Sequence, residues 1–199
     1  MPNKHYVFWP FTSDSYTNMG GEKSGAGRQL REFRRPNNKG NVSYVRYGSK
    51  KHAGCLAKCN AQDKSLYVTG HGAVGAQVIS NTPDGSDDVV HALVVVMRLI
   101  EYGLKNTSCC KLKLFSCYSG VDGAGGFSFA KAVHLCLRRL GYNNIEVYGY
   151  SAAIGTYVGD HTIFIGVHPD LPQFGSGMWK KASVVRAKID EDYLNDLEE

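Results

Sequence analysis

A histidine and a cysteine, which together could form an activated nucleophile, each come at the end of an apolar segment of the chain. His71 lies in the triplet Gly70-His71-Gly72 after SLYVT (65–69), and Cys117 follows KLKLFS (111–116). A cysteine attacks a carbonyl group when a histidine can take its proton and when N–H donors await the developing oxyanion. The N–H groups of Gly72 and Cys117 are candidate donors, because glycine carries no side chain that covers the approach. His71 and Cys117 are therefore the candidate catalytic pair, and Gly120 is expected to turn the chain away from the thiol.

The elements around these residues predict a parallel sheet. Apolar or alternating segments predict strands over 5–11, 42–47, 65–69, 111–116 and 144–150. Amphipathic or apolar patterns predict helices over 87–104 and 127–140, whereas 53–62 fits either a loop or a helical turn. Strands alternating with helices favour right-handed crossovers and a site at the carboxyl ends of the strands. His71 and Cys117 both stand at such ends, although they lie 46 positions apart.

The remaining segments complete a single α/β domain over residues 1–199. Residues 12–40 are rich in Ser, Gly, Asn and Arg, and we expect a long, partly mobile loop there. Residues 162–167 and 183–189 are expected to form a C-terminal β-hairpin around the Gly- and Pro-rich segment 169–177.

The two motifs together resemble the clan CD cysteine peptidases, which include caspases, legumains, gingipains and the self-cleaving domains of large bacterial toxins. The matching segments are LYVTGHG (66–72) and LKLFSCYSG (112–120), and a looser resemblance extends over 65–151. It implies the caspase–hemoglobinase fold, a three-layer sandwich around a mostly parallel sheet. It also implies that His71 protonates the leaving amine, that Cys117 attacks the scissile carbonyl, and that Gly72 and Cys117 hold the oxyanion. No third acidic residue is implied.

The chain is most similar to the autoprocessing toxin domains within this clan, and the resemblance implies a bacterial effector or toxin protease with a role in virulence. By that resemblance the specificity pocket would draw on Trp9, Phe11, Phe115, Ser116, Ser151 and Ala152. Toxin domains of this kind bind inositol hexakisphosphate as an activator on a basic surface. The basic residues expected to bind such a polyanion here are Arg28, Arg31, Lys180, Lys181, Arg186 and Lys188.

Three alternatives stay open at this stage. A catalytically inactive protein- or anion-binding module could keep the same fold. The glycines at 70, 72 and 75 match a dinucleotide-binding fingerprint, but AQVISNTPDGS (76–86) is a poor start for the helix that such a motif needs. His52, Cys55 and Cys59 could form part of a zinc site, although C-x-x-x-C is wider than the usual spacing and lacks a second pair.

Composition narrows the class of protein further. The formal charge is +5, and a basic stretch over 28–51 has few interleaved aromatic residues, so we expect no nucleic-acid partner. The start MPNKHYVFWPFTSD does not resemble a signal peptide, and the apolar segment 89–100 is too short for a membrane span. Six cysteines without a leader favour free thiols in a reducing compartment. We expect a cytoplasmic protein, or one delivered into a host cell by a specialised system, that acts on a protein or peptide and needs no metal or cofactor.

Overall fold

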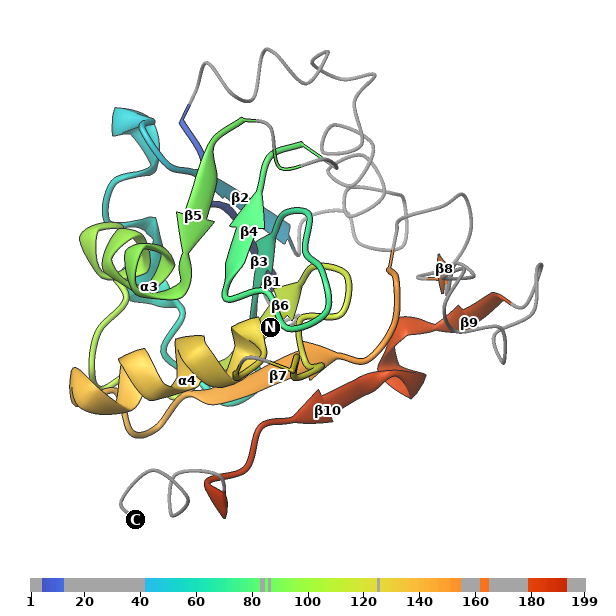
Figure 1. Cartoon of the computed structure of the whole chain (residues 1–199). Coiled ribbons are helices and arrows are strands. Elements are labelled where there is room, and N and C mark those ends of the chain that lie inside the picture. Colours follow the sequence, from blue (N-terminus) through green and yellow to red (C-terminus); the bar gives the residue numbers. More distant parts are fainter. Residues whose placement is uncertain are drawn as a thin grey trace.

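A computed structural model shows an α/β fold around a mostly parallel sheet of six strands (Figure 1). The structure describes residues 5–12, 42–82, 85, 87–124, 126–154, 162–164 and 179–192. The predicted α/β class with a mostly parallel central sheet is confirmed. The predicted loop over 12–40 lies outside the described residues, except for Thr12.

The sheet has the order β10-β7-β6-β3-β1-β2. Its strands are β1 (His5–Trp9), β2 (Val42–Arg46), β3 (Ser65–Thr69), β6 (Lys111–Phe115), β7 (Glu146–Tyr150) and β10 (Arg186–Lys188). All neighbours are parallel except β10, which runs antiparallel to β7 at one edge. The first five strands fall within the segments that the sequence predicted, because each carries the expected alternation or apolar run.

Two helices cover one face of the sheet, α3 (Ala92–Glu101) and α4 (Phe129–Arg139), and they lie side by side (Figure 1). Alternate strand residues such as Phe8, Leu66 and Leu112 point into the core beneath them. Ser128 begins α4 by accepting a hydrogen bond from the N–H of Lys131, and Gly141 follows the helix with φ of 81°. The helix predicted over 127–140 is therefore confirmed.

Two predicted elements were wrong. The helix expected from residue 87 begins only at Ala92, because Val89–His91 forms strand β5, which pairs antiparallel with β4 (Val78–Ser80). The C-terminal hairpin joins β8 (Thr162–Phe164) to β9 (Trp179–Lys181) rather than to residues 183–189. That later segment forms the 3-10 helix η5 (Ala182–Val184) and then β10, which extends the main sheet instead.

The segment over 53–62, which the sequence left open, contains a 3-10 helix. The two short helices of this region are η3 (Lys50–His52) and η4 (Cys55–Lys58), and η4 buries Leu56 in the core. No helix in the described ranges is long and apolar enough to cross a membrane.

Candidate active site

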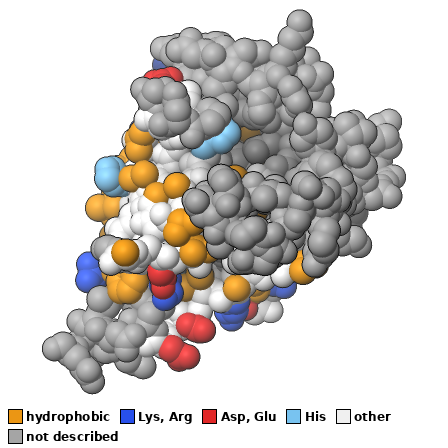
Figure 2. All heavy atoms as spheres, turned by 45° about the vertical axis from the view of Figure 1, so that its right-hand side comes forward, with side chains coloured by type: hydrophobic (Ala, Val, Ile, Leu, Met, Phe, Trp, Pro, Cys, Tyr) orange, Lys and Arg blue, Asp and Glu red, His pale blue; other side chains and the backbone are white. Residues whose placement is uncertain are grey.

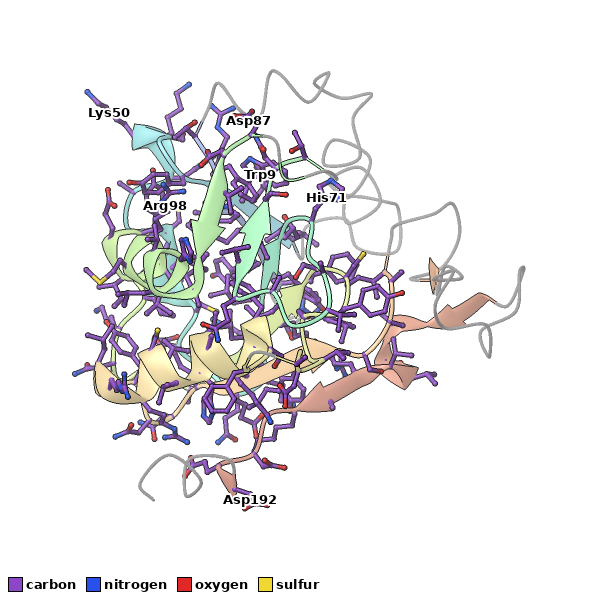
Figure 3. The ribbon with its side chains drawn as sticks, viewed as in Figure 1. Trp9, Lys50, His71, Asp87, Arg98 and Asp192 are labelled. Carbon is purple, nitrogen blue, oxygen red and sulfur yellow. The ribbon has the colours of Figure 1, made fainter. Side chains whose placement is uncertain are left out.

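The register of the sheet brings the ends of β3 and β6 together, and His71 and Cys117 each follow one of these ends. Thr69, at the end of β3, is the parallel partner of Phe115, at the end of β6. His71 and Cys117 each come two residues after this pair, so both leave the same edge of the sheet at the same height. Figure 3 shows the His71 side chain at this end of the sheet, beyond β4.

The two turns that carry these residues are in contact at Gly72. A Cβ atom at position 72 would lie 2.7 Å from the carbonyl oxygen of Cys117 and 3.1 Å from Oγ of Ser116. Atoms cannot approach so closely without displacement, so only glycine allows the histidine turn to pack against the backbone of Cys117 and the side chain of Ser116. The sequence predicted glycine here for access to its N–H, and the structure adds close backbone packing as a second reason.

The main chain of His71 is held by the β4–β5 hairpin. The N–H of His71 donates to the carbonyl of Ser80 over 2.8 Å, and the N–H of Ser80 donates back over 3.0 Å. A hollow of about 170 Å³ lies beside His71, and the other residues that line it are uncharged. Its lining residues are Gly72, Ala73, Ala76, Val78, Ser80, Gly85 and Val89. The hairpin that replaced the first turn of the predicted helix is therefore what positions the histidine.

The thiol of Cys117 is bonded to the backbone of Ile154. The N–H of Ile154 donates to Sγ over 3.3 Å, and the thiol donates to the carbonyl of Ile154 over 3.4 Å. Burial raises the pKa of Cys117 above its ordinary value, and burial lowers that of His71. At neutral pH both groups are uncharged, and the pair rests as thiol and imidazole rather than as an ion pair.

The chain after Cys117 runs against β7. Tyr118 adopts a left-handed φ of 55°, its N–H donates to Ala152, and the N–H of Gly120 donates to Tyr150. A Cβ atom at Gly120 would meet the Gly149 and Tyr150 backbones at 3.0 Å. Gly120 therefore allows the chain after Cys117 to pack closely against the backbone of β7. The turn that was expected at Gly120 is made at Tyr118 instead.

The residues predicted for the specificity pocket are mostly buried. Trp9, Phe11, Phe115, Ser116 and Ala152 expose at most 2% of their surface, whereas Ser151 is exposed. Phe11 packs against Gly70, and Phe115 and Ala152 belong to a second apolar cluster with Tyr150 and Val185. Oγ of Ser116 has no hydrogen-bond partner among the described residues, and it faces Gly72. Ser116 is therefore the member of this set that lies at the contact between the two turns.

The predicted polyanion-binding residues are only partly described. Arg28 and Arg31 lie outside the described residues, and Lys180 and Lys181 belong to β9. Arg186 and Lys188 lie on β10, where the Arg186 guanidinium stands 5.4 Å from the ring centre of Tyr148. Lys188 forms an ion pair with Glu146 over 2.8 Å. Arg186 and Lys188 are alternate residues of the edge strand β10, so their side chains lie on the same face of the sheet.

Lys113 is a basic residue of this face that sequence reasoning missed. Its ammonium group is buried, and it donates to Oγ of Ser65 over 2.9 Å and to the hydroxyl of Tyr67 over 3.0 Å. Burial, followed by the charges of Arg186 and Lys111, lowers the pKa of Lys113 to about 8. No described carboxylate forms an ion pair with it. The alternation Lys111-Leu112-Lys113-Leu114 could have revealed it, since it places both lysines on the face opposite the helices.

Neither alternative site has the local structure that it needs. Nδ1 of His52, a member of the zinc set, accepts a hydrogen bond from the N–H of Arg46, and Cys59 is buried. Within the described ranges no three His, Cys, Asp or Glu residues stand close enough to bind a metal. The glycine fingerprint is followed by β4 and not by a helix, which removes the N-terminus that would hold a pyrophosphate.

No protein-family model matches the sequence, and no curated protein matches it. The geometry of the two turns and the order of the elements are therefore the observations that bear on the class of the protein.

Proposed function

We propose that the chain is a cysteine endopeptidase of the caspase–hemoglobinase type, with a three-layer sandwich architecture and His71 and Cys117 as its catalytic pair. The observation that carries this proposal is the contact of the two turns at Gly72. It is supported by the register of Thr69 with Phe115, which brings both candidate residues to one edge of the sheet.

In the proposed reaction Cys117 attacks the carbonyl carbon of the scissile peptide bond while His71 takes the thiol proton. The N–H groups of Gly72 and Cys117 hold the oxyanion, and His71 then gives its proton to the departing amine. Water cleaves the resulting thioester, with His71 as general base. Because both groups rest uncharged, proton transfer accompanies attack, and the thiol must exchange its bonds to Ile154 for the substrate.

The basic sheet face supports a second part of the proposal, activation by a polyanion such as inositol hexakisphosphate. Lys113 and Arg186 stand near one another on this face, since the charge of Arg186 helps to lower the pKa of Lys113, and hydroxyl and aromatic groups surround them. Lys113 lies on β6, the strand that leads into Cys117. An anion bound there would act on the element that carries the nucleophile. A setting in a bacterial effector or self-processing toxin rests on the family resemblance alone.

The runner-up is a catalytically inactive protein- or anion-binding module. The observation that favours it is the state of the Cys117 thiol. This thiol is half-buried, and it forms hydrogen bonds with both the N–H and the carbonyl of Ile154. Such a thiol is a poor nucleophile until its surroundings change.

The deciding experiment is labelling of the full chain with a panel of peptide electrophiles, with and without inositol hexakisphosphate. The wild type is compared with Cys117→Ala, His71→Ala and the matched control Cys136→Ala, which removes another half-buried thiol. A peptidase labels at Cys117, prefers one peptide sequence, and loses labelling in the first two variants but not in the control. Labelling of Cys117 no faster than of Cys55 or Cys109 under every condition rejects the peptidase and favours the binding module.

A further inference from the structure

The hollow of about 170 Å³ at the candidate active site is built on the outer face of the β4–β5 hairpin. Ile79 and Val90, which pair across the two strands, point into the main core. The residues that alternate with them point the other way and line the hollow, and these are Val78, Ser80 and Val89. The hairpin thus has one face in the core and the other on the hollow.

The wall of the hollow is largely apolar. Apart from His71, the described residues on it are alanines, valines, glycines and Ser80, and the hydroxyl of Ser80 already donates to the carbonyl of Thr82. The rim is open to solvent, because Val89 exposes 44% of its surface and Gly85 is exposed as well. A charged group that entered would lose its water and gain no charged partner among these residues, so the hollow favours an apolar side chain.

The strand order places this hollow on one side of the thiol. Cys117 follows β6, which lies between β7 and β3 in the sheet. Its thiol is bonded to Ile154, which follows β7, whereas the His71 turn follows β3. The described lining includes His71 and Gly72 but none of residues 116–120 or 151–154. The hollow therefore lies on the histidine side of the site, away from Ile154.

In the proposed reaction the two halves of the substrate separate across these groups. The acyl half ends on Sγ of Cys117, and the departing amine takes its proton from His71. The first residue of the departing half carries that amine, so its side chain begins within reach of the imidazole. We propose that the hollow binds the side chain of the residue that follows the scissile bond, and that this residue is apolar. The inference rests on the proposed function and adds a class of substrate to it.

The volume of the hollow sets the size of the preferred side chain. An apolar cavity of about 150 Å³ accommodates benzene, so the hollow has room for the side chain of leucine, methionine or phenylalanine. Glycine after the scissile bond would leave the hollow unfilled, and aspartate or lysine would place a charge against its valines and alanines. Leucine is therefore the reference residue for a test.

The test is hydrolysis of internally quenched peptides by the full chain, under the condition in which Cys117 labels fastest. All peptides share the sequence of the best electrophile before the scissile bond, and they carry leucine, glycine, aspartate or lysine after it. We expect kcat/KM to be at least about tenfold higher for the leucine peptide than for each of the others. The electrophiles contain only the half before the bond, so their labelling of Cys117 does not depend on the hollow.

Two substitutions test whether the hollow causes this preference. Val89→Lys places a cation at the rim, and we expect the ratio of kcat/KM for the leucine and aspartate peptides to fall at least about tenfold. Ala76→Phe fills the hollow and should remove the preference for leucine over glycine. Val74→Lys is the matched control for Val89→Lys, because Val74 is 45% exposed and is not among the residues that line the hollow. The control must keep the wild-type ratios, and all three variants must label at Cys117 at the wild-type rate.

Two results overturn the inference and leave the proposed function standing. One is equal kcat/KM for the four peptides in a protein that labels at Cys117. The other is a Val89→Lys variant that changes the preference among the electrophiles and not among the peptides, since the hollow would then bind the acyl half. Absent labelling of Cys117, or absent hydrolysis of every peptide, rejects the proposed function and the inference with it. The wild-type series decides the matter even where a variant fails to fold.

Discussion

At the scale of single residues, the protonation of Cys117 controls its reactivity. Burial raises the pKa of this thiol and lowers the pKa of His71, so the thiolate forms only as pH rises. We expect the rate of Cys117 alkylation by iodoacetamide to increase about tenfold per pH unit between about pH 6 and pH 8. The measurement is the rate of modification at Cys117, followed by mass spectrometry. A rate that is constant over this range would show a preformed thiolate–imidazolium pair and contradict the resting state described above.

Gly72 provides the sharpest test of the contact between the two turns. In Gly72→Ala the new methyl group would meet the carbonyl oxygen of Cys117, so one turn must move. A displacement of about 1 Å at a reacting group costs on the order of 100-fold in rate, and we expect peptide-directed labelling of Cys117 to fall by that factor.

The matched control for Gly72 is Gly141→Ala, at the end of α4. Gly141 has φ of 81° and no other atom near its Cβ position, so alanine there brings backbone strain without a clash. Labelling of Cys117 in this control must stay at the wild-type rate. Equal losses in both variants would mean that general destabilisation, and not the contact at Gly72, lowers the reactivity.

The sequence revealed the chemical types at the site but not all of their contacts. His71 and Cys117 were recognisable because each follows a short apolar strand, and parallel strands end at one edge. The hydrogen bonds between Sγ of Cys117 and the backbone of Ile154 could not be predicted, since the two residues lie 37 positions apart and no motif marks the turn that brings them together. Lys113 was not predicted for a different reason, because a lysine inside a strand is usually exposed and only the folded sheet shows that this one is buried.

At the scale of elements, the strongest periodic patterns were the most informative. The strand over 65–69 and the helix over 127–140 have clear boundaries in composition, and the structure confirms both. The segment that begins at Asp87 predicts a helix over its whole length, because acidic residues stand in its first turn and Gly103 lies near its end. Its first β-branched residues, Val89 and Val90, pair instead with Ile79 and its neighbours, and this tertiary pairing overrides the local pattern.

His134 on α4 makes the stability of the protein sensitive to acid. It exposes only 3% of its surface, and its Nε2 accepts a hydrogen bond from Nε of Arg138 over 3.1 Å. Burial and then the charge of Arg138 lower its pKa to about 4, with a smaller opposing effect from Asp190 and a smaller supporting one from Lys188. The unfolded chain therefore binds the proton first, and stability is lost as pH falls from about 6.5 toward 4.

The test is urea unfolding of the wild type and of His134→Gln, which can still accept from Arg138 but does not titrate. Between about pH 7 and pH 5 we expect the wild type to lose about 2 kcal/mol more of its unfolding free energy than the variant loses. His91→Gln, at an exposed histidine, serves as the control and should follow the wild type. Identical pH dependence in the wild type and in His134→Gln would show that this histidine does not cause the acid sensitivity.

At the scale of the whole molecule, the two faces of the sheet differ in character. One face supplies the apolar core beneath α3 and α4, and the other carries Lys111, Lys113, Arg186 and Lys188 among tyrosines. Figure 2 shows another uneven distribution, since charged side chains gather toward the lower end of the described surface and its middle is largely uncharged. The protein thus separates a charged region from the uncharged hollow beside His71.

Lys113→Met tests whether the basic face binds a polyanion. We expect inositol hexakisphosphate to raise the unfolding midpoint of the wild type, with an affinity at least about tenfold weaker in Lys113→Met. Because the pKa of Lys113 is about 8, binding should also weaken as pH rises above that value. Binding is measured by calorimetry, with the exposed Lys105→Met as the matched control. Equal affinities in both variants would place any polyanion site elsewhere.

The order of strands in the sheet has a consequence for the rate at which the protein folds. Each parallel pairing joins residues between 35 and 60 positions apart, and β1, near the start of the chain, must insert between β2 and β3. Pairings of this kind must close long loops before they gain any contact energy, so the folding barrier is largely entropic. We expect refolding from denaturant to take milliseconds to seconds rather than microseconds. We therefore expect the edge where β3 and β6 end, from which His71 and Cys117 follow, to become complete only late in that process.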